Sequence, residues 1–186
     1  YWDMEEVPPV EGDPVELVCN ELENVCELLI RADVPVGVAL SGGLDSSAIA
    51  ALAAKKYPGT MHAFSVGYPG RPTNDERNDA KVLADLLQMP FHEIELETVD
   101  LVANFEKMNF QRDDPIADIS GFGYYAVSKT AREHGIPVLL QGQGGDEVLW
   151  GYQWVKDAAE ATDNRLRNVR PTFKRFIKTS LKNLFG

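Results

Sequence analysis

The sequence has no stretch long enough to cross a lipid bilayer. Its apolar runs, such as residues 35–40 and 137–140, have the length of a strand, whereas a membrane-spanning helix needs about 20 apolar residues. No charged, then apolar, then small-residue pattern opens the sequence, so it shows no secretory signal. These absences argue against a membrane partner, and we expect a cytoplasmic protein.

Cysteine and histidine are scarce as well. Cys19 and Cys26 lie seven residues apart in one helical pattern, about two turns along the axis, which is too far for a disulfide. We predict that both are small core residues. His62, His92 and His134 lie on different predicted elements without the spacing of metal ligands, so we expect them to hold no metal ion. The remaining composition, 44% hydrophobic and 25% charged, is typical of one globular domain.

Positive charge is sparse outside the last part of the chain. The net charge is -11, yet from Asn164 onward there are basic residues and no acidic ones. An acidic body argues against a nucleic-acid partner and would repel a bare triphosphate. Any nucleotide bound here should therefore arrive with a metal ion and rest on backbone donors.

The basic segment at residues 165–186 has apolar residues at helical spacing, which predicts an amphipathic helix. One interpretation is a helix that docks on a membrane surface or a partner. The other, which we favour, is a helix that begins the next part of a longer chain and packs against it.

Strand and helix patterns alternate through the body of the chain. After a linker at residues 1–12, Asp13 and Pro14 predict the start of a long helix. The body, residues 13–164, then contains predicted strands and helices in alternation: strands 34–40, 61–68, 91–96 and 137–141, and helices 46–56, 75–87, one from Thr98, one from Ser120 and one after the last strand. We expect residues 91–96 to lie nearer an edge. This order predicts an α/β fold with a parallel sheet, helices on both faces, and a ligand site at the carboxyl ends of the strands.

The motif SGGLDSS, residues 41–47, lies between a buried strand and a helix. Gly42 and Gly43 permit a tight turn with exposed N–H groups, the serines add hydroxyl donors, and the helix contributes its positive end. A Walker lysine is absent, so Asp45 is favourable in this anion-binding loop only if it binds a cation. The motif thus predicts a site for magnesium polyphosphate, although a serine-rich helix cap is the plainer alternative.

SGGLDSS resembles the pyrophosphate loop (PP-loop) of the N-type ATP pyrophosphatases, whose fold is adenine nucleotide alpha hydrolase-like. In its wider context the chain is similar to the synthetase domain of glutamine-hydrolysing asparagine synthetases and to the related β-lactam-forming synthetases. The resemblance rests on further motifs that cover the chain except its basic tail: YWD at residues 1–3, the segment 31–54, FSVGY at 64–68, DDPIADIS at 113–120 and GQGGDEVLWGY at 142–152.

A second glycine-rich segment, QGQGGDE at residues 141–147, follows the last predicted strand. Its glycines permit close backbone approach, and Asp146 adds a carboxylate at the sheet edge where Asp45 is expected. A helix N-terminus with acidic residues favourable to the dipole is the alternative. In the resembled family the aspartates matching Asp45 and Asp146 together hold magnesium, and the nucleotide is bound by the positions matching these residues: Ala39, Leu40, Ser41, Gly42, Gly43, Asp45, Ser46, Ser47, Val66, Gln141 and Gly142.

The resemblance implies a ligase that uses ATP and Mg²⁺. An aspartate-like carboxylate would be adenylated with release of pyrophosphate, and ammonia drawn from glutamine would then form the amide, as in asparagine biosynthesis. The ammonia would come from a glutamine amidotransferase domain before residue 1, which the YWD stretch follows in that family. The family's C-terminal lysine would lie beyond residue 186, so we expect this chain alone to bind nucleotide weakly and not to catalyse. The oligomeric state is open, a homo-oligomer included.

Two positions depart from the family pattern SGEGxDE. Gln141 replaces the serine, and Gln143 replaces the glutamate that acts on the nucleophile. Glutamine orients a nucleophile but takes no proton at neutral pH. Three alternatives follow: Asp114 or Asp118 is the base, the carboxylate and nucleophile differ from the family's, or the protein is a non-catalytic nucleotide-binding module.

Overall fold

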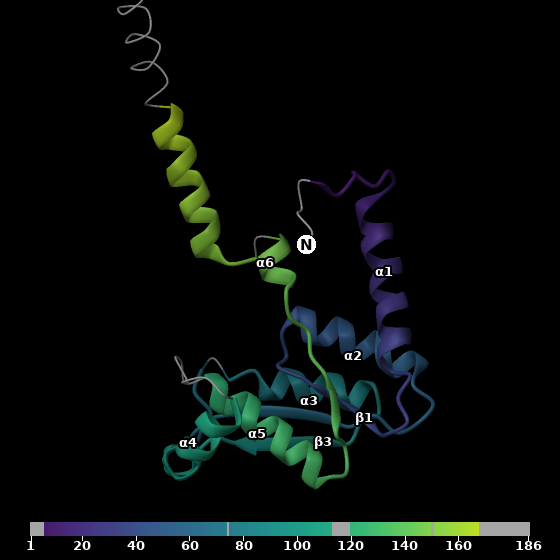
Figure 1. Cartoon of the computed structure of the whole chain (residues 1–186), viewed down its shortest axis with the longest axis vertical. Coiled ribbons are helices and arrows are strands. Elements are labelled where there is room, and N and C mark those ends of the chain that lie inside the picture. Colours follow the sequence, from purple (N-terminus) through teal and green to yellow (C-terminus); the bar gives the residue numbers. More distant parts are fainter. Residues whose placement is uncertain (1–5, 74, 113–119, 150, 168–186) are drawn as a thin grey trace, which may run out of the picture. The chain divides into compact units, whose positions relative to one another are not determined.

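The structure is a computed structural model that describes residues 6–73, 75–112, 120–149 and 151–167 (Figure 1). The chain forms two compact units, residues 1–142 and residues 143–186. The first contains the whole sheet. None of the helices in the described residues is long and apolar enough to span a membrane.

The first unit is built on a parallel sheet of four strands with the order β3-β2-β1-β4. The strands are β1 (Val36–Ala39), β2 (Ala63–Gly67), β3 (Phe91–Glu95) and β4 (Val138–Leu140). β1 is central and pairs with β2 on one side and β4 on the other. All four predicted strands are confirmed with shorter ends, and so is the edge position of residues 91–96.

The described residues of this unit form five helices: α1 (Pro14–Leu29), α2 (Leu44–Lys56), α3 (Arg77–Leu86), α4 (Thr98–Arg112) and α5 (Ser120–Glu133). The predicted start of α1 is confirmed, because the Asp13 carboxylate accepts hydrogen bonds from the N–H groups of Val15 and Glu16 at 2.9 and 3.0 Å. Such an N-cap satisfies donors that the helix itself leaves without partners.

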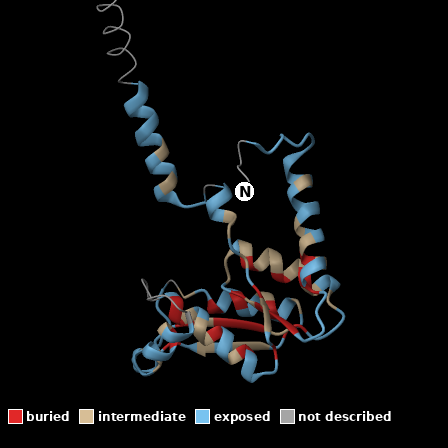
Figure 2. Cartoon of the chain, viewed as in Figure 1, coloured by how far each residue is buried: buried red, intermediate tan, exposed pale blue. Residues whose placement is uncertain are grey.

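Alternate residues of the strands point to the two faces of the sheet, and each face has its own apolar layer. Val36, Val38 and Leu40 pack with alanines of α2 and α3 on one face. On the other face Phe64 packs with Val127 of α5 and its neighbours. Helices therefore cover both faces, as predicted, and the buried strands in Figure 2 lie between them.

The two cysteines differ in environment. Cys26 is buried and Cys19 is exposed, and both are free thiols. The absence of a disulfide between them is confirmed, whereas the prediction that Cys19 is a core residue is wrong. The first turns of α1 carry mostly exposed residues, and the helix packs on α2, with Cys26 buried in its last turns.

The second unit begins with α6 (Gly145–Leu149) and continues with a helix over residues 153–167. A helix after the last strand was predicted. Most of the predicted amphipathic helix at residues 165–186 lies outside the described residues.

Candidate functional site: the loop between β1 and α2

The predicted phosphate loop lies where expected, between the carboxyl end of β1 and the first turn of α2. Gly42 has a φ of +94°, in the left-handed region that favours glycine. A Cβ at this position would lie 2.7 Å from the carbonyl oxygen of Glu76 and 3.0 Å from its Cβ. Two separate reasons therefore require glycine at position 42: its positive φ, and the close approach of Glu76, the residue before α3.

Two serine hydroxyls of the loop bind the loop itself. The Oγ atoms of Ser41 and Ser46 are 2.9 Å apart, and Ser41 Oγ accepts the N–H of Gly43 at 3.1 Å. Ser46 Oγ donates to the carbonyl oxygen of Gly43 at 3.2 Å, and its side chain is buried. These hydrogen bonds hold the turn in one conformation, so the main role of the Ser46 hydroxyl in this structure is to stabilise the loop.

The first turn of α2 presents free backbone donors. Gly43 is the N-cap, and no side chain caps this helix, so the N–H groups of Leu44, Asp45 and Ser46 have no intrahelical acceptor. Within the described residues, neither the Asp45 carboxylate nor the Ser47 hydroxyl makes a hydrogen bond or ion pair. Uncapped N–H groups at the positive end of a helix favour an anion, and the unpaired carboxylate beside them favours a cation.

The end of β4 lies against this same turn. A Cβ at Gly142 would lie 2.6 Å from the carbonyl oxygen of Asp45, and even closer to the carbonyl carbon of Asp45 and the nitrogen of Ser46. These are backbone atoms, so no rotamer change relieves the clash. The close backbone approach predicted for Gly142 is confirmed, and it brings the start of the second glycine-rich segment to the phosphate loop.

The residues expected to line the nucleotide lie on both faces of the sheet. Ala39 and Val66 are partly buried and pack beside Phe64 on the α5 face. Leu40 is 1% exposed and its side chain belongs to the opposite layer. Any contact of Leu40 with a ligand must therefore use its backbone, whereas Ala39 and Val66 keep some accessible surface.

The remaining predicted site residues are not tested by the structure. Gln143 and Asp146 belong to the second unit, where both are exposed, and Asp114 and Asp118 lie outside the described residues. No three histidine, cysteine or carboxylate side chains in the described part of the chain are arranged to hold a metal ion. Asp45 and Asp146 belong to separate units, so their joint role stays a prediction.

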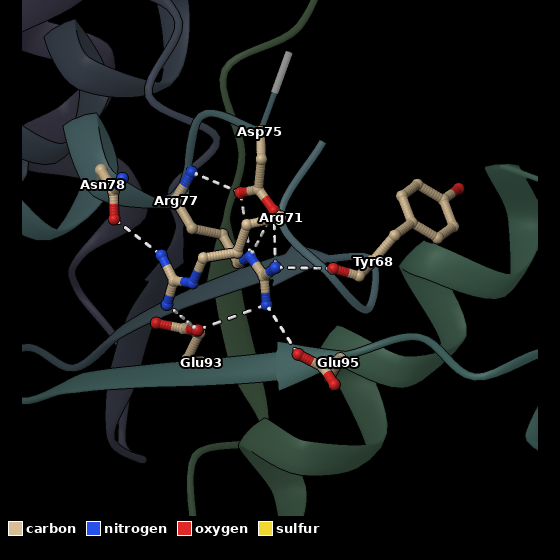
Figure 3. A network of polar contacts seen from close by, with 7 residues as sticks. All are labelled: Tyr68, Arg71, Asp75, Arg77, Asn78, Glu93 and Glu95. Carbon is tan, nitrogen blue, oxygen red and sulfur yellow. Dashed lines mark hydrogen bonds and ion pairs between the residues drawn. The ribbon is translucent and has the colours of Figure 1, made fainter. Parts of the chain in front are cut away.

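Sequence reasoning missed a buried arginine at the start of α3 (Figure 3). Arg77 is 1% exposed and pairs with Asp75, itself 6% exposed, through its Nε at 2.9 Å. It also reaches Glu93 of β3 at 3.2 Å and the Tyr68 carbonyl oxygen at 2.8 Å. The signal was available, because Glu93 and Glu95 alternate on an edge strand and so place two acids on one face, where a cation is needed.

The three histidines gather in space, contrary to what their separate elements suggested. His62 Nδ1 and His92 Nε2 are 2.8 Å apart, and the rings of His92 and His134 have centroids 4.1 Å apart. They lie beside Phe64 at the amino ends of β2 and β3, away from the phosphate loop. Burial lowers the pKa of His62 and of His92, and the nearby His134 lowers both further.

The fold can now be placed among known ones. Residues of this chain superpose on the U34-tRNA thiolase NcsA from Methanococcus maripaludis with a TM-score of 0.51 and 16% identity, over 72% of this chain and 48% of that one. They superpose on a glutamine-dependent NAD⁺ synthetase from Acinetobacter baumannii, solved with adenosine diphosphate, with a TM-score of 0.50 and 21% identity, over 79% and 29%. The fold is adenine nucleotide alpha hydrolase-like, of the PP-loop type, as predicted.

Within that class, residues 18–185 match the asparagine synthase family, and the chain belongs to it. The match continues through the basic tail, which our motifs had left out. A putative glutamine-hydrolysing asparagine synthetase of Methanocaldococcus jannaschii is 34% identical over 155 residues. The amidase chry2 of Gibberella zeae is 29% identical over 171 residues. Each alignment covers 82% of this chain, and the chain spans only 30% and 26% of the length of these relatives.

Proposed function

We propose that this chain is the ATP-binding part of an amide-forming ligase and that the loop at residues 41–47 holds the polyphosphate of ATP. One observation carries the proposal: a glycine turn and an uncapped helix N-terminus meet at the carboxyl end of the central parallel strand. Ligands of open parallel sheets bind at that end. Membership of the asparagine synthase family supports the same chemistry.

The proposed reaction has two steps. A carboxylate oxygen attacks the α-phosphorus of ATP, the bond to the β-phosphate oxygen breaks, and pyrophosphate leaves with its electron pair. An amine nitrogen then attacks the acyl carbon of the adenylate, AMP leaves, and the nitrogen loses a proton to a base. Positioning and charge neutralisation provide most of the acceleration in such transfers.

The loop residues have separate roles in this scheme. The N–H groups at the start of α2 bind the β- and γ-phosphates, and the Ser47 hydroxyl adds a free donor. Ala39 and Val66 line the adenosine, with the backbone of Gln141 and Gly142 beside it. The hydroxyls of Ser41 and Ser46 keep the turn in the shape that these contacts require.

The Asp45 side chain suits a metal role. It is partly buried and has no partner in the described part of the chain, a condition that is unfavourable beside phosphate unless a cation intervenes. Asp45 and Asp146 would together hold Mg²⁺, which neutralises the charge that develops on pyrophosphate as it leaves. This shared role is part of the proposal, as is Asp114 or Asp118 as the base that accepts the amine proton.

Calorimetric titration of the chain with MgATP tests the binding step. We expect weak saturable binding that Asp45→Asn reduces, because the variant keeps the side-chain volume and loses the charge. Asp79→Asn is the matched control, since Asp79 is another acidic residue in the first turn of a helix and lies outside the loop. No heat of binding from the unmutated chain, or equal loss in both variants, would contradict the proposed site.

The substrates follow from the family and are tested separately. We propose an aspartate-like carboxylate and ammonia from glutamine, supplied by a neighbouring domain, in a cytoplasmic enzyme. Exchange of labelled pyrophosphate into ATP, measured on the protein as encoded and scanned over amino acids, identifies the carboxylate. Exchange that depends on some other acid would indicate a different amide or lactam ligase. No exchange with any acid would contradict the proposal that the protein is a ligase.

A second candidate function is a non-catalytic nucleotide-binding module, and Gln143 is the observation that favours it. An amide cannot accept the proton that the family glutamate would take. Gln143→Glu distinguishes the two candidates when pyrophosphate exchange and amide formation are measured together. Activity gained only in the variant supports the binding module, whereas activity in the unmutated protein excludes it.

A further inference from the structure

The most deeply buried charged group in the described residues lies beside the phosphate loop without belonging to it. Arg77 opens α3 and is 1% exposed. Its guanidinium contacts four acceptors from three segments: Asp75 before the helix, Tyr68 after β2, and Glu93 and Glu95 on β3 (Figure 3). Burying a guanidinium is unfavourable unless its donors are paired, and here they are.

The sheet is shaped to accept this side chain. A Cβ at Gly67, the last residue of β2, would lie 2.6 Å from Arg77 Cδ and closer still to the guanidinium. Glu93 pairs in register with Ser65, and Glu95 pairs with Gly67, so the two acids and the glycine share one end of the sheet. Arg77 thus fastens the first turn of α3 to the carboxyl ends of β2 and β3.

That first turn is also a wall of the phosphate loop. Glu76, the residue before Arg77, is the N-cap of α3. Its carbonyl oxygen is the atom that a Cβ on Gly42 would meet first, and the nitrogen of Ala80, one turn later, is the third nearest atom. The position of Gly42 is therefore set by the backbone that Arg77 holds in place.

We propose that Arg77 is a positioning residue for the phosphate loop: by tying α3 to β2 and β3, it fixes the Glu76 backbone against which Gly42 turns. The proposal rests on the proposed function of the loop. Because Arg77 is buried and its guanidinium contacts are with other residues of the fold, it acts through Glu76 and Gly42 and does not touch the nucleotide. If Arg77 had only a structural role, its replacement would lower stability and would weaken the binding of all ligands alike.

The test compares three variants of the chain. Arg77→Met removes the charge and keeps the length. Arg77→Lys keeps the charge but offers one point donor in place of a planar fork. Arg71→Met is the matched control, because Arg71 also pairs with Glu93 but is 45% exposed and makes its other hydrogen bond to Asn78. Folding of each variant is checked by circular dichroism.

The measurement distinguishes binding of the phosphate part of the nucleotide from binding of its adenosine part. Affinities for magnesium pyrophosphate and for adenosine are measured by NMR titration. We expect Arg77→Met to weaken pyrophosphate binding by about tenfold and to leave adenosine binding unchanged. Arg77→Lys should fall between, and Arg71→Met should match the unmutated chain. Equal losses for both ligands, or an equal loss in Arg71→Met, would overturn the proposal.

A second measurement needs no ligand. If Arg77 positions the loop, the amide resonances of Gly42, Gly43 and Leu44 should shift and exchange faster in folded Arg77→Lys than in Arg71→Met. Unchanged loop amides would overturn the positioning role even in a chain that binds no nucleotide. Failure of the unmutated chain to bind magnesium pyrophosphate, with the loop amides still responding to Arg77→Lys, would instead overturn the proposed function and leave the mechanical coupling in place.

Discussion

Two adjacent glycines in the phosphate loop have different reasons to be glycine. Gly42 has a φ of +94° and lies against Glu76, whereas Gly43 is extended at φ -72° and a Cβ there would meet only the Ser41 hydroxyl, at 3.3 Å. The backbone alone therefore requires glycine at Gly42. At Gly43 any need for glycine must come from a ligand.

Gly42→Ala should lower the free energy of unfolding by about 2 kcal/mol or more, since a left-handed alanine is strained and its methyl meets a backbone oxygen. Gly43→Ala should lower it by less than about 0.5 kcal/mol. Urea denaturation of both variants measures the difference. Similar losses in the two variants would show that the turn is not held as the structure has it.

The histidine cluster makes stability depend on pH near neutrality. The pKa values of His62 and His92 are lowered in the folded protein, so around pH 6 the unfolded chain binds more protons than the folded one. Stability from these rings is present above the ordinary histidine pKa and is lost as pH falls through it toward the lowered values.

His92→Phe should therefore flatten the loss of stability between pH 7 and pH 5, because phenylalanine keeps the stacking with Phe64 and does not titrate. Thermal denaturation of both proteins over that pH range is the measurement. Parallel curves for the two proteins would mean that the cluster does not resist protonation.

At the scale of the element, the start of α3 depends on a carboxylate. The hydrogen bonds and charge of Arg77 hold the pKa of Asp75 at about 2, against an ordinary value of 3.8. A group whose pKa is lowered on folding contributes stability above its unfolded pKa. This contribution is complete at neutral pH and is lost as the pH falls from about 4 to about 2.

Asp75→Asn should lower the free energy of unfolding at pH 7 by about 3 kcal/mol, since it leaves a buried guanidinium without its main partner. It should also remove part of the acid-induced loss between pH 4 and pH 2. Asp79→Asn, at an exposed position in the first turn of α3, is the control for the loss of one negative charge. Denaturation curves at pH 7 and pH 3 decide the matter, and equal stability of the two variants at pH 7 would refute it.

Elements were predictable from the sequence where the pattern is local. The N-cap at Asp13, the alternation of strands and helices, and the position of SGGLDSS between β1 and α2 all follow from residues close together in the chain. Contacts between distant segments were not predictable in the same way. Nothing near Arg77 in the sequence shows that Gly67 leaves room for it, and nothing near His62 shows that His134 ends beside His92.

Burial, like the contacts between distant segments, could not be predicted from the local sequence. Cys19 sits on a regular helical pattern, yet the first turns of α1 extend past the residues they could pack on, so the thiol is exposed. For the candidate site, the loop and its glycines were predicted and located, whereas the structure alone reveals that Gly142 approaches the first turn of α2. The joint use of Asp45 and Asp146 stays a prediction because they belong to separate units.

For the whole molecule, net charge decides how a nucleotide approaches. A net charge of -11 repels free ATP, whereas a nucleic-acid binder would attract a polyanion. Salt screens this repulsion, with a Debye length of about 10 Å at 0.1 M. The charge thus predicts an unusual salt dependence for an anion-binding protein.

We expect metal-free ATP, in the presence of a chelator, to bind more tightly as sodium chloride is raised from about 20 to about 200 mM, because repulsion between like charges is screened. MgATP carries less charge and should respond less. Titrations at both salt concentrations provide the measurement. Weaker binding of metal-free ATP at high salt would mean that a local positive field, not the acidic body, governs the site.

The contact of Gly142 with the start of α2 also has a consequence for synthesis. Gly142, whose backbone lies against the first turn of α2, is translated about a hundred residues after the loop at residues 41–47, and it reaches that turn only when β4 pairs with β1. Chains emerge from the ribosome N-terminus first, at about 5 to 20 residues per second. A nascent chain should therefore pass several seconds with the loop already made and Gly142 not yet beside it.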